Sequence, residues 1–194
     1  MAKLYFYYAS MNAGKSTTLL QSSFNYQERG METMLFTAAL DDRYAAGMIT
    51  SRIGLEAGAY LFDPGTDMRA AVEAEHAVRP LDCVLVDEAQ WLSRAQVFQL
   101  AAVCDRMGIP VLAYGLRTDF RAQLFEGSAA LLAIADTLVE LKAVCECGRK
   151  ATMNLRVDAE GRAVREGAQT EVGGNDRYVA LCRRHFLEKL GEAA

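Results

Sequence analysis

The sequence predicts an α/β fold, with a parallel sheet flanked by helices and a small β-rich unit at the C-terminal end. Apolar runs alternate with segments of helical periodicity as far as Leu141, which is the pattern of a sheet built from strand–helix–strand units. The runs have few polar interruptions, as expected of strands covered on both faces. After Leu141 no helical period appears until about His185, and short β elements take its place. We therefore expect two units, over residues 1–141 and 142–194.

The elements of the first unit follow from the apolar runs and from the residues that begin and end helices. Gly30 and Gly108 are natural helix stops, and Ser93 with Gln96 three residues later is a capping-box pattern. Thr66 is the expected cap of another helix. In chain order we expect a strand at 4–8, a helix at 15–28, a strand at 31–38, a long connection at 40–60, a helix from Thr66 to about 77, a strand at 81–86, a helix after Ser93 and a strand at 111–116.

The second unit and the long connection need separate interpretations. In the second unit we expect short β elements at 145–149, 153–157 and 164–172, with a turn at 158–161. The connection at 40–60 is long for a compact domain, and connections of such length are commonly functional.

Composition excludes several classes of protein. The 194 residues carry a formal net charge of −4 and a pI of about 5.3, with no long Lys/Arg run, which argues against an extended nucleic-acid surface. No apolar run approaches the roughly 20 residues of a membrane-spanning helix, and the N-terminus lacks the features of a signal peptide. We expect a cytoplasmic protein with reduced cysteines that binds neither nucleic acid nor membranes.

A phosphate-binding loop is predicted between the first strand and the first helix, over the sequence Ala9-Ser10-Met11-Asn12-Ala13-Gly14-Lys15-Ser16. A strand, a short turn ending in Gly-Lys-Ser and a helix form the layout of a P-loop. Backbone N–H groups and the helix N-terminus attract phosphate, Lys15 can reach the β- and γ-phosphates, and Ser16 can bind Mg²⁺. Ala9 stands where the usual pattern has glycine. The alternative is a chance Gly-Lys-Ser at a helix start.

An acidic pair, Asp87-Glu88, directly follows the strand predicted at 81–86. An apolar strand followed by Asp and Glu is a Walker B pattern, in which Asp87 would hold Mg²⁺ opposite Ser16. Glu88 would accept a proton from an attacking hydroxyl or water. Ligands of parallel sheets bind at the carboxyl ends of the strands, so the pair and the P-loop are expected together. The alternative is an acidic pair on the surface.

Two pairs of soft ligands occur in the second unit, Cys145-x-Cys147 and Cys182-x-x-His185. Three thiolates and an imidazole suit tetrahedral Zn²⁺, and a filled set of four ligands indicates a structural site. The alternative is a set of buried free thiols with a surface histidine. The other cysteines, Cys83 and Cys104, lie in apolar segments and are expected in the core, and His76 is expected to be a solvated helix residue.

Together these motifs resemble the type II thymidine kinases, the zinc-containing kind, and specifically their bacterial branch. The resembling segments keep the family's order along nearly the whole chain: YYASMNAGKS at 7–16, LVDEAQ at 85–90, YGLRTDF at 114–120, CECGRK at 145–150 and GGNDRY at 173–178. The resemblance implies a P-loop NTPase-like (RecA-like) nucleotide-binding domain over 1–141. It also implies a zinc-ribbon-like subdomain over 142–194, with a lasso loop that covers the nucleoside.

The family transfers the γ-phosphoryl group of ATP to the 5′-hydroxyl of thymidine or deoxyuridine, and the resemblance implies the same activity here, with dTMP formed for pyrimidine salvage. It also implies Glu88 as the general base, a homotetramer and feedback inhibition by dTTP. The implied ATP and Mg²⁺ residues are Ala9, Ser10, Met11, Asn12, Ala13, Gly14, Lys15, Ser16, Asp41, Arg43, Asp87, Glu88, Ala89 and Gln90. The implied nucleoside residues are Met11, Leu116, Phe120, Phe125, Val172, Gly173, Gly174 and Tyr178, and the implied zinc ligands are Cys145, Cys147, Cys182 and His185.

Alternatives remain open at this stage. Phe120 and Phe125 could be ordinary core residues, and Tyr178 could be a strand aromatic that anchors the zinc unit. For the whole chain, one alternative is a P-loop ATPase whose Glu88 activates water and whose zinc unit binds nucleic acid. Another is a zinc-ribbon interaction module with a relic nucleotide site. The acidic pI and the short length count against the first, and the intact P-loop and acidic pair count against the second.

Overall fold

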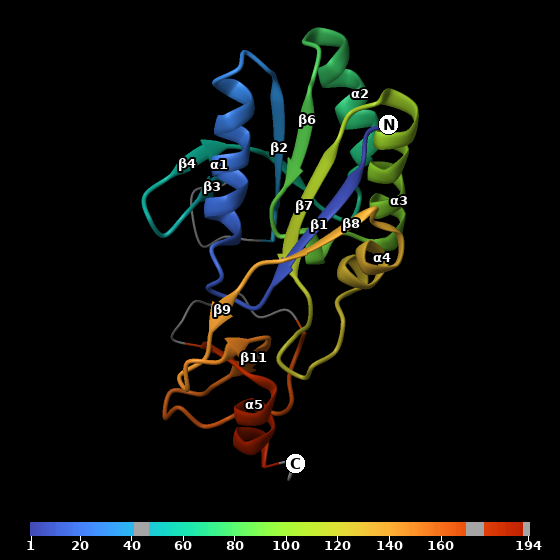
Figure 1. Cartoon of the computed structure of the whole chain (residues 1–194). Coiled ribbons are helices and arrows are strands. Elements are labelled where there is room, and N and C mark those ends of the chain that lie inside the picture. Colours follow the sequence, from blue (N-terminus) through green and yellow to red (C-terminus); the bar gives the residue numbers. More distant parts are fainter. Residues whose placement is uncertain (41–46, 170–176, 192–194) are drawn as a thin grey trace.

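The computed structural model describes residues 1–40, 47–169 and 177–191. Its centre is a six-stranded sheet (Figure 1) in which every neighbouring pair of strands is parallel. In spatial order the strands are β5 (Tyr60–Phe62), β2 (Thr33–Ala38), β6 (Cys83–Val86), β7 (Val111–Leu116), β1 (Leu4–Ala9) and β8 (Thr137–Glu140). This parallel sheet, flanked by helices, confirms the predicted fold class.

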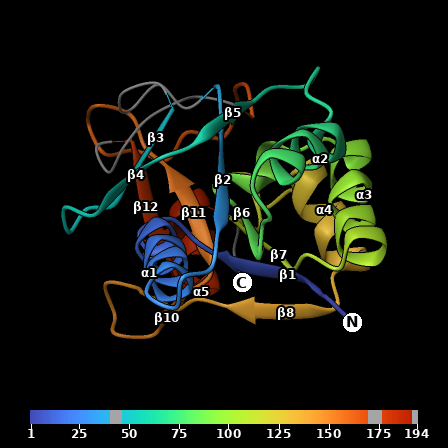
Figure 2. The same ribbon diagram turned by 90° about the horizontal axis from the view of Figure 1, so that it is seen from above.

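Helices lie on both faces of the sheet, as the view in Figure 2 shows. One face carries α1 (Lys15–Gln27), and the other carries α2 (Met68–Val78), α3 (Arg94–Ala102) and α4 (Glu126–Ile134). Alternate residues of β6 serve the two faces, because Val84 and Val86 pack with α2–α4 whereas Cys83 and Leu85 pack with α1. This two-sided burial explains the uninterrupted apolar runs. It also confirms Cys83 as a core residue; Cys104 is likewise buried.

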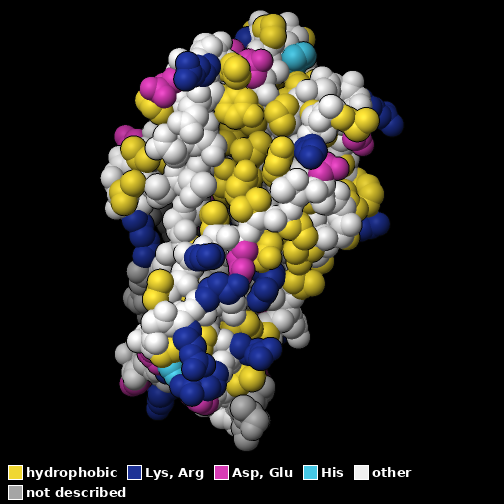
Figure 3. All heavy atoms as spheres, viewed as in Figure 1, with side chains coloured by type: hydrophobic (Ala, Val, Ile, Leu, Met, Phe, Trp, Pro, Cys, Tyr) yellow, Lys and Arg dark blue, Asp and Glu magenta, His cyan; other side chains and the backbone are white. Residues whose placement is uncertain are grey.

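The side of the sheet next to α1 is only partly covered. Hydrophobic side chains gather in the centre of this view of the surface (Figure 3). Tyr5 and Tyr7 of β1 are half-buried here, and the ring of Tyr7 stacks on that of Tyr114 at a centroid distance of 4.5 Å. The single helix on this face therefore leaves an aromatic strip on β1 partly open to solvent.

Two helix-end predictions are confirmed. The capping box at the start of α3 is formed, since Ser93 accepts a hydrogen bond from the Gln96 N–H and the Gln96 side chain accepts one from the Ser93 N–H. A π-helical turn, η2 (Val103–Met107), extends this helix to Gly108. Gly108 adopts the left-handed conformation (φ 70°) that ends a helix.

Three predictions in the first unit need correction. The 40–60 connection contains a hairpin of β3 (Met48–Thr50) and β4 (Glu56–Gly58), and the edge strand β5 begins at its end. The cap of α2 is Asp67, which accepts from the Ala70 N–H at 2.9 Å, whereas Thr66 bonds to Asp63. His76 does more than face solvent: its Nδ1 accepts the Leu81 N–H at 2.9 Å. Both α4 and β8 were missed.

The second unit packs around a separate apolar cluster and lies beyond the end of the sheet where β1 leads into α1 (Figure 1). It consists of the paired strands β9 (Ala143–Val144) and β10 (Lys150–Ala151), the paired strands β11 (Met153–Arg156) and β12 (Tyr178–Leu181), and the helix α5 (Arg183–Leu190). Of the strand predicted at 164–172, residues 164–169 form no strand and the rest lie outside the described residues. Next to this segment, Ala163 pairs with Val157 in an isolated bridge. Within the described ranges, no helix combines the length and apolarity needed to cross a bilayer.

Candidate active site

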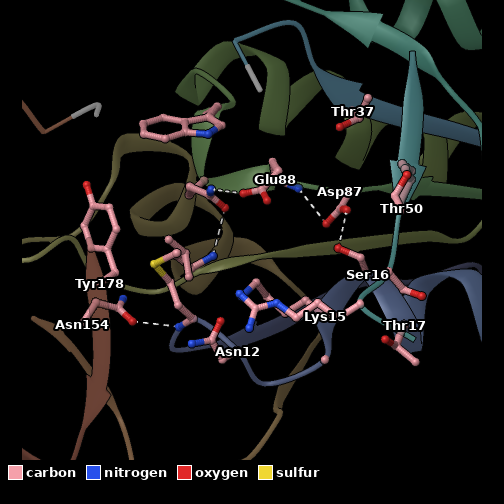
Figure 4. Close-up of a pocket in the computed structure, with 18 of the residues that line it drawn as sticks. Asn12, Lys15, Ser16, Thr17, Thr37, Thr50, Asp87, Glu88, Asn154 and Tyr178 are labelled. Atoms are coloured by element: carbon pink, nitrogen blue, oxygen red, sulfur yellow. Dashed lines mark hydrogen bonds between the residues drawn. The ribbon is translucent and has the colours of Figure 1, made fainter. Parts of the chain in front are cut away.

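A cavity of about 380 Å³ opens where the carboxyl ends of the central strands meet the second unit. Figure 4 shows its two ends. Lys15, Ser16 and Asp87 lie toward the end near Thr37 and Thr50, whereas Tyr178 and Asn154 lie at the opposite end, with Glu88 between them. The sheet topology therefore brings together the P-loop, the acidic pair and the C-terminal unit.

The P-loop connects β1 to α1 as the motif predicts. Gly14 precedes the helix with φ 76°, a left-handed conformation that glycine adopts without strain. Lys15 is buried, and its Nζ donates to the backbone carbonyl of Ser10 at 3.1 Å. The cation therefore lies folded against its own loop, beside the first N–H groups of α1, where an anion would bind.

The side chains of Ser16 and Asp87 are in direct contact at the cavity, as two ligands of one cation would have to be close together. The Ser16 hydroxyl donates to Asp87 Oδ2 at 2.8 Å, and the Glu88 N–H donates to Asp87 Oδ1 at 3.0 Å. Burial is the main cause that raises the pKa of Asp87 to about 7, and the neighbouring Glu88 carboxylate adds to it. A bound cation would offset the cost of burying the charged Asp87 carboxylate. Because Mg²⁺ prefers oxygen ligands, the Ser16 hydroxyl and this carboxylate fit that ion.

Glu88 begins the short 3₁₀ turn η1 (Ala89–Trp91) in a left-handed backbone conformation, with φ 52°. Such a conformation is uncommon for a residue with a side chain and is found mostly where the surrounding structure enforces it. The Glu88 carboxylate accepts a hydrogen bond from Gln90 Nε2. The side chain is largely buried but lines the cavity, which is the placement a proton acceptor needs.

The cavity is lined by all the side chains predicted to bind the nucleoside that fall within the described residues: Met11, Leu116, Phe120, Phe125 and Tyr178. Of these, Tyr178 lies at the end opposite Thr37 and Thr50 (Figure 4). Phe125 is also packed edge-on against Trp91, at 5.0 Å between ring centroids. Phe120 is covered on one side by the guanidinium of Arg156, 3.9 Å from the ring centroid. The same arginine donates to the hydroxyl of Tyr178. The rings of Phe120 and Phe125 are therefore part of the packed interior and also of the cavity wall.

Other predicted residues do not line the cavity. Ser10 donates to the Ala151 carbonyl at 3.3 Å, Ala13 packs against the C-terminal cluster, and Ala89 is buried in the main core. Ala9 is buried at the end of β1. The predictions for Asp41, Arg43, Val172, Gly173 and Gly174 lie outside the described residues.

Several cavity residues were missed by sequence reasoning. Thr37 lines the cavity from β2, and Thr50 lines it from the unpredicted hairpin. Asn154 and Gln169 line it from the second unit. Asn154 accepts the Met11 N–H at 2.8 Å and donates to the Thr118 carbonyl at 3.0 Å. Asn154 lies within the strand predicted at 153–157, and this is the sequence signal that could have pointed to it, because an amide that is buried in a strand demands partners.

The four predicted metal ligands come together in the second unit. Atoms of Cys145, Cys147, Cys182 and His185 that could bind a metal all lie within 4.8 Å of one another. The Sγ atoms of Cys147 and Cys182 are 3.9 Å apart, far beyond a disulfide but close to the roughly 3.8 Å edge of a tetrahedron with Zn–S bonds of about 2.3 Å. Burial acts to raise the pKa of Cys145, but N–H groups and the His185 ring outweigh it and lower that pKa to about 6. The donor set therefore fits a structural metal ion such as Zn²⁺.

Comparison with known proteins places these features in one family. A family model described as "Thymidine kinase" matches residues 2–186. The chain is 73% identical over 192 residues to a thymidine kinase of Novosphingobium aromaticivorans, covering 99% of this chain and 100% of that protein. It is 65% identical to one of Zymomonas mobilis (98% of both chains) and 60% identical to one of Vibrio parahaemolyticus (99% and 100%). These matches confirm the resemblance to bacterial type II enzymes, and the chain therefore belongs to the thymidine kinase family.

Proposed function

We propose that this chain transfers the γ-phosphoryl group of ATP to the 5′-hydroxyl of thymidine, giving dTMP and ADP, and that deoxyuridine is also accepted. The observation that carries the proposal is the two-ended cavity. A P-loop and an acidic pair lie at one end, an aromatic compartment lies at the other, and Glu88 lies between them (Figure 4). This is the order in which a triphosphate, a proton acceptor and a nucleoside must be arranged for in-line transfer.

At the phosphate end, positioning and charge carry the chemistry. Loop N–H groups from Asn12 to Ser16 would hold the phosphates, and Lys15 would leave the Ser10 carbonyl to contact the β- and γ-phosphates. Ser16 and Asp87 would hold Mg²⁺, and that ion would offset the negative charge that develops on the phosphates. Asp41 and Arg43 join this set by resemblance.

At the nucleoside end, Met11, Leu116, Phe120, Phe125 and Tyr178 would enclose the base and sugar. The 5′-oxygen attacks the γ-phosphorus while the bond to the β–γ bridging oxygen breaks, and Glu88 takes the hydroxyl proton. By resemblance, Val172, Gly173 and Gly174 form the lasso that covers the base. We assign the boundary between nucleotide and zinc units to residue 141.

Further properties follow from the resemblance as proposals. Zn²⁺ bound by the Cys₃His cluster would be structural, and reduced thiols agree with a cytoplasmic location. dTTP would inhibit, because it presents a thymidine and a triphosphate to one cavity that has a compartment for each. A homotetramer would cover the aromatic strip on β1, which is partly open to solvent in the single chain.

Turnover of ATP with and without thymidine tests the proposal, with Glu88→Gln beside the wild type. We expect thymidine-dependent ADP release, lost by at least about 100-fold in Glu88→Gln with nucleotide affinity retained. Glu73→Gln, which changes an exposed carboxylate on α2, should be fully active. Near-normal turnover by Glu88→Gln would remove Glu88 from its role. ATP hydrolysis that is stimulated by DNA and ignores thymidine would favour the ATPase alternative.

A further inference from the structure

Gln90, expected among the ATP and Mg²⁺ residues, lines the cavity, and both ends of its side-chain amide are bonded to protein groups. It is 2% exposed and lies in η1, two residues after Glu88. Its Nε2 donates to Glu88 Oε2 at 2.5 Å, and its Oε1 accepts the backbone N–H of Leu116 at 2.9 Å. The amide therefore forms a bridge from the proposed general base to the end of β7.

The direction of this bridge is fixed by its partners. The N–H of Leu116 is only a donor, so the amide oxygen of Gln90 must face it. The NH₂ group then faces Glu88, where it donates to the carboxylate. An amide hydrogen bond to one oxygen sets the plane of the carboxylate without competing for the proton that Glu88 is to receive.

The backbone around Gln90 is tightly enclosed, because the turn η1 packs directly against two glycines, Gly115 and Gly127. A Cβ at Gly115 would lie 2.9 Å from both the backbone nitrogen and the Oε1 of Gln90. A Cβ at Gly127 would lie 2.6 Å from the carbonyl oxygens of Ala89 and Leu92. The turn is thus held between β7 and α4 at distances that only glycine permits.

We propose that Gln90 is a positioning residue that aims the Glu88 carboxylate into the cavity. Its second anchor, Leu116, belongs to the wall of the nucleoside compartment. The bridge therefore ties the direction of the base to the wall against which the nucleoside lies. This inference rests on the proposed role of Glu88.

The test is a double-mutant cycle between Gln90→Met and Glu88→Gln, measured by single-turnover and steady-state kinetics. Gln90→Met keeps side-chain length and removes both hydrogen bonds. We expect kcat to fall by about 100-fold with the KM values for ATP and thymidine within about twofold, because ground-state contacts remain. In the Glu88→Gln background, Gln90→Met should cost no more than about threefold, since a residue acting through the carboxylate has nothing left to position.

Gln96→Met is the matched control. Gln96 is also 2% exposed with a fully used amide, but it caps α3 away from the cavity, so its loss should lower the melting temperature and leave kcat unchanged. If Gln90→Met does not fold, Gln90→Asn, one methylene too short to span both partners, should show the same kcat loss.

The outcomes separate the two proposals. Equal loss from Gln90→Met in both backgrounds, or no loss in the wild type, overturns the positioning role while Glu88 stays the base. Full turnover by Glu88→Gln alone removes the base itself, and the proposed positioning of it fails for that reason.

Discussion

Arg156 connects two aromatic residues, Phe120 and Tyr178, of the proposed nucleoside compartment. It is 3% exposed, and its guanidinium lies over the Phe120 ring. Its Nε and Nη2 donate to the Tyr178 hydroxyl at 3.0 and 2.8 Å, and Nη2 also donates to the Ala168 carbonyl. A planar guanidinium can stack on one ring and bond a second group in its own plane, which an ammonium cannot.

Arg156→Lys should therefore loosen both rings while keeping the charge. We expect KM for thymidine to rise about tenfold, the equivalent of ~1.4 kcal/mol, with KM for ATP nearly unchanged because the P-loop is not touched. Steady-state kinetics with each substrate varied in turn measures the split. Arg162→Lys is the control, because Arg162 is exposed and its guanidinium pairs with the carboxylates of Asp158 and Glu160 at the surface. Equal increases in both KM values would contradict a role confined to the nucleoside end.

Asp87 should lower the stability of the metal-free protein at neutral pH and above. Burial raises its pKa from 3.8 to about 7, so the folded state binds this proton more tightly than the unfolded state does. The unfavourable contribution is absent below the unfolded pKa, grows as the pH rises from about 4 to 7, and is constant above that range. A bound cation would offset it.

Asp87→Asn removes this charge, and Ser16 can reverse its hydrogen bond to meet the new amide. In metal-free buffer at pH 8 we expect a melting temperature about 2–4 °C higher than wild type, with turnover at least about 100-fold lower. The stability difference should shrink toward pH 4. Thermal denaturation in EDTA across this range checks it, and a variant less stable than wild type at pH 8 would show that the carboxylate's hydrogen bonds outweigh its desolvation.

At the scale of elements, the turn after β6 depends on how closely α4 approaches it. Gly127 lies in the first turn of α4, and a methyl group there would meet two backbone carbonyls at 2.6 Å. Backbone cannot rotate aside as a side chain can. Any added atom must push α4 and η1 apart and move Glu88 with η1.

Gly127→Ala should therefore lower the free energy of unfolding by roughly 1–3 kcal/mol. It should also lower kcat at least about tenfold. Gly58→Ala is the matched control, because a Cβ there meets nothing within 4 Å and needs no positive φ. Melting temperatures and kcat of the two variants decide the matter. A Gly127→Ala enzyme with wild-type kcat would mean that η1 tolerates the displacement.

Elements with strong local signals were predictable from sequence, and those without were not. The strand–turn–helix of the P-loop and the capping box of α3 are set by neighbouring residues. By contrast, α4 has apolar residues around much of its circumference, and β8 is a half-exposed edge strand of four residues, so neither shows a clean period. The hairpin at 48–58 uses strands of three residues, too short for any pattern.

The residues of the candidate site show the same difference between local signals and contacts that only the fold creates. The P-loop and the acidic pair are short motifs and were found as such. Asn154, by contrast, meets Met11 across 143 residues of sequence and Thr118 across 36, and only the fold brings such groups together. Gln90 belongs to a motif that is visible in the sequence, but the use of its amide depends on Leu116, a residue of the strand β7.

At the scale of the whole molecule, the short segment 151–154 connects the C-terminal unit to the P-loop and to the segment that follows β7. The Ala151 carbonyl accepts from Ser10, and Asn154 accepts from the Met11 N–H, which holds the first half of the P-loop. On the other side, the Thr152 carbonyl accepts from Arg117, and Asn154 donates to Thr118. The P-loop is thus supported from outside its own domain.

The four metal ligands flank this segment. Cys147 lies three residues before β10, and Cys182 directly follows β12, which pairs with β11 along 153–156. The apolar cluster of this unit is small, and structural zinc contributes roughly 10–16 kcal/mol of apparent binding free energy in small zinc-finger peptides. Loss of the metal should therefore release segment 151–154, and with it the P-loop.

Removal of zinc should accordingly weaken nucleotide binding at a distance from the metal. After treatment with a chelator, gel filtration and restoration of Mg²⁺, we expect the Kd for ADP to rise at least about tenfold, or ~1.4 kcal/mol, and the melting temperature to fall. Cys147→Ser, which changes the exposed ligand, should reproduce both effects, and Cys104→Ala, which changes a core cysteine outside the cluster, should retain zinc and affinity. Calorimetric titration with ADP and elemental analysis of the same samples measure the outcome. Unchanged ADP affinity in protein shown to be free of zinc would mean that the hydrogen bonds of segment 151–154 hold the P-loop without help from the metal.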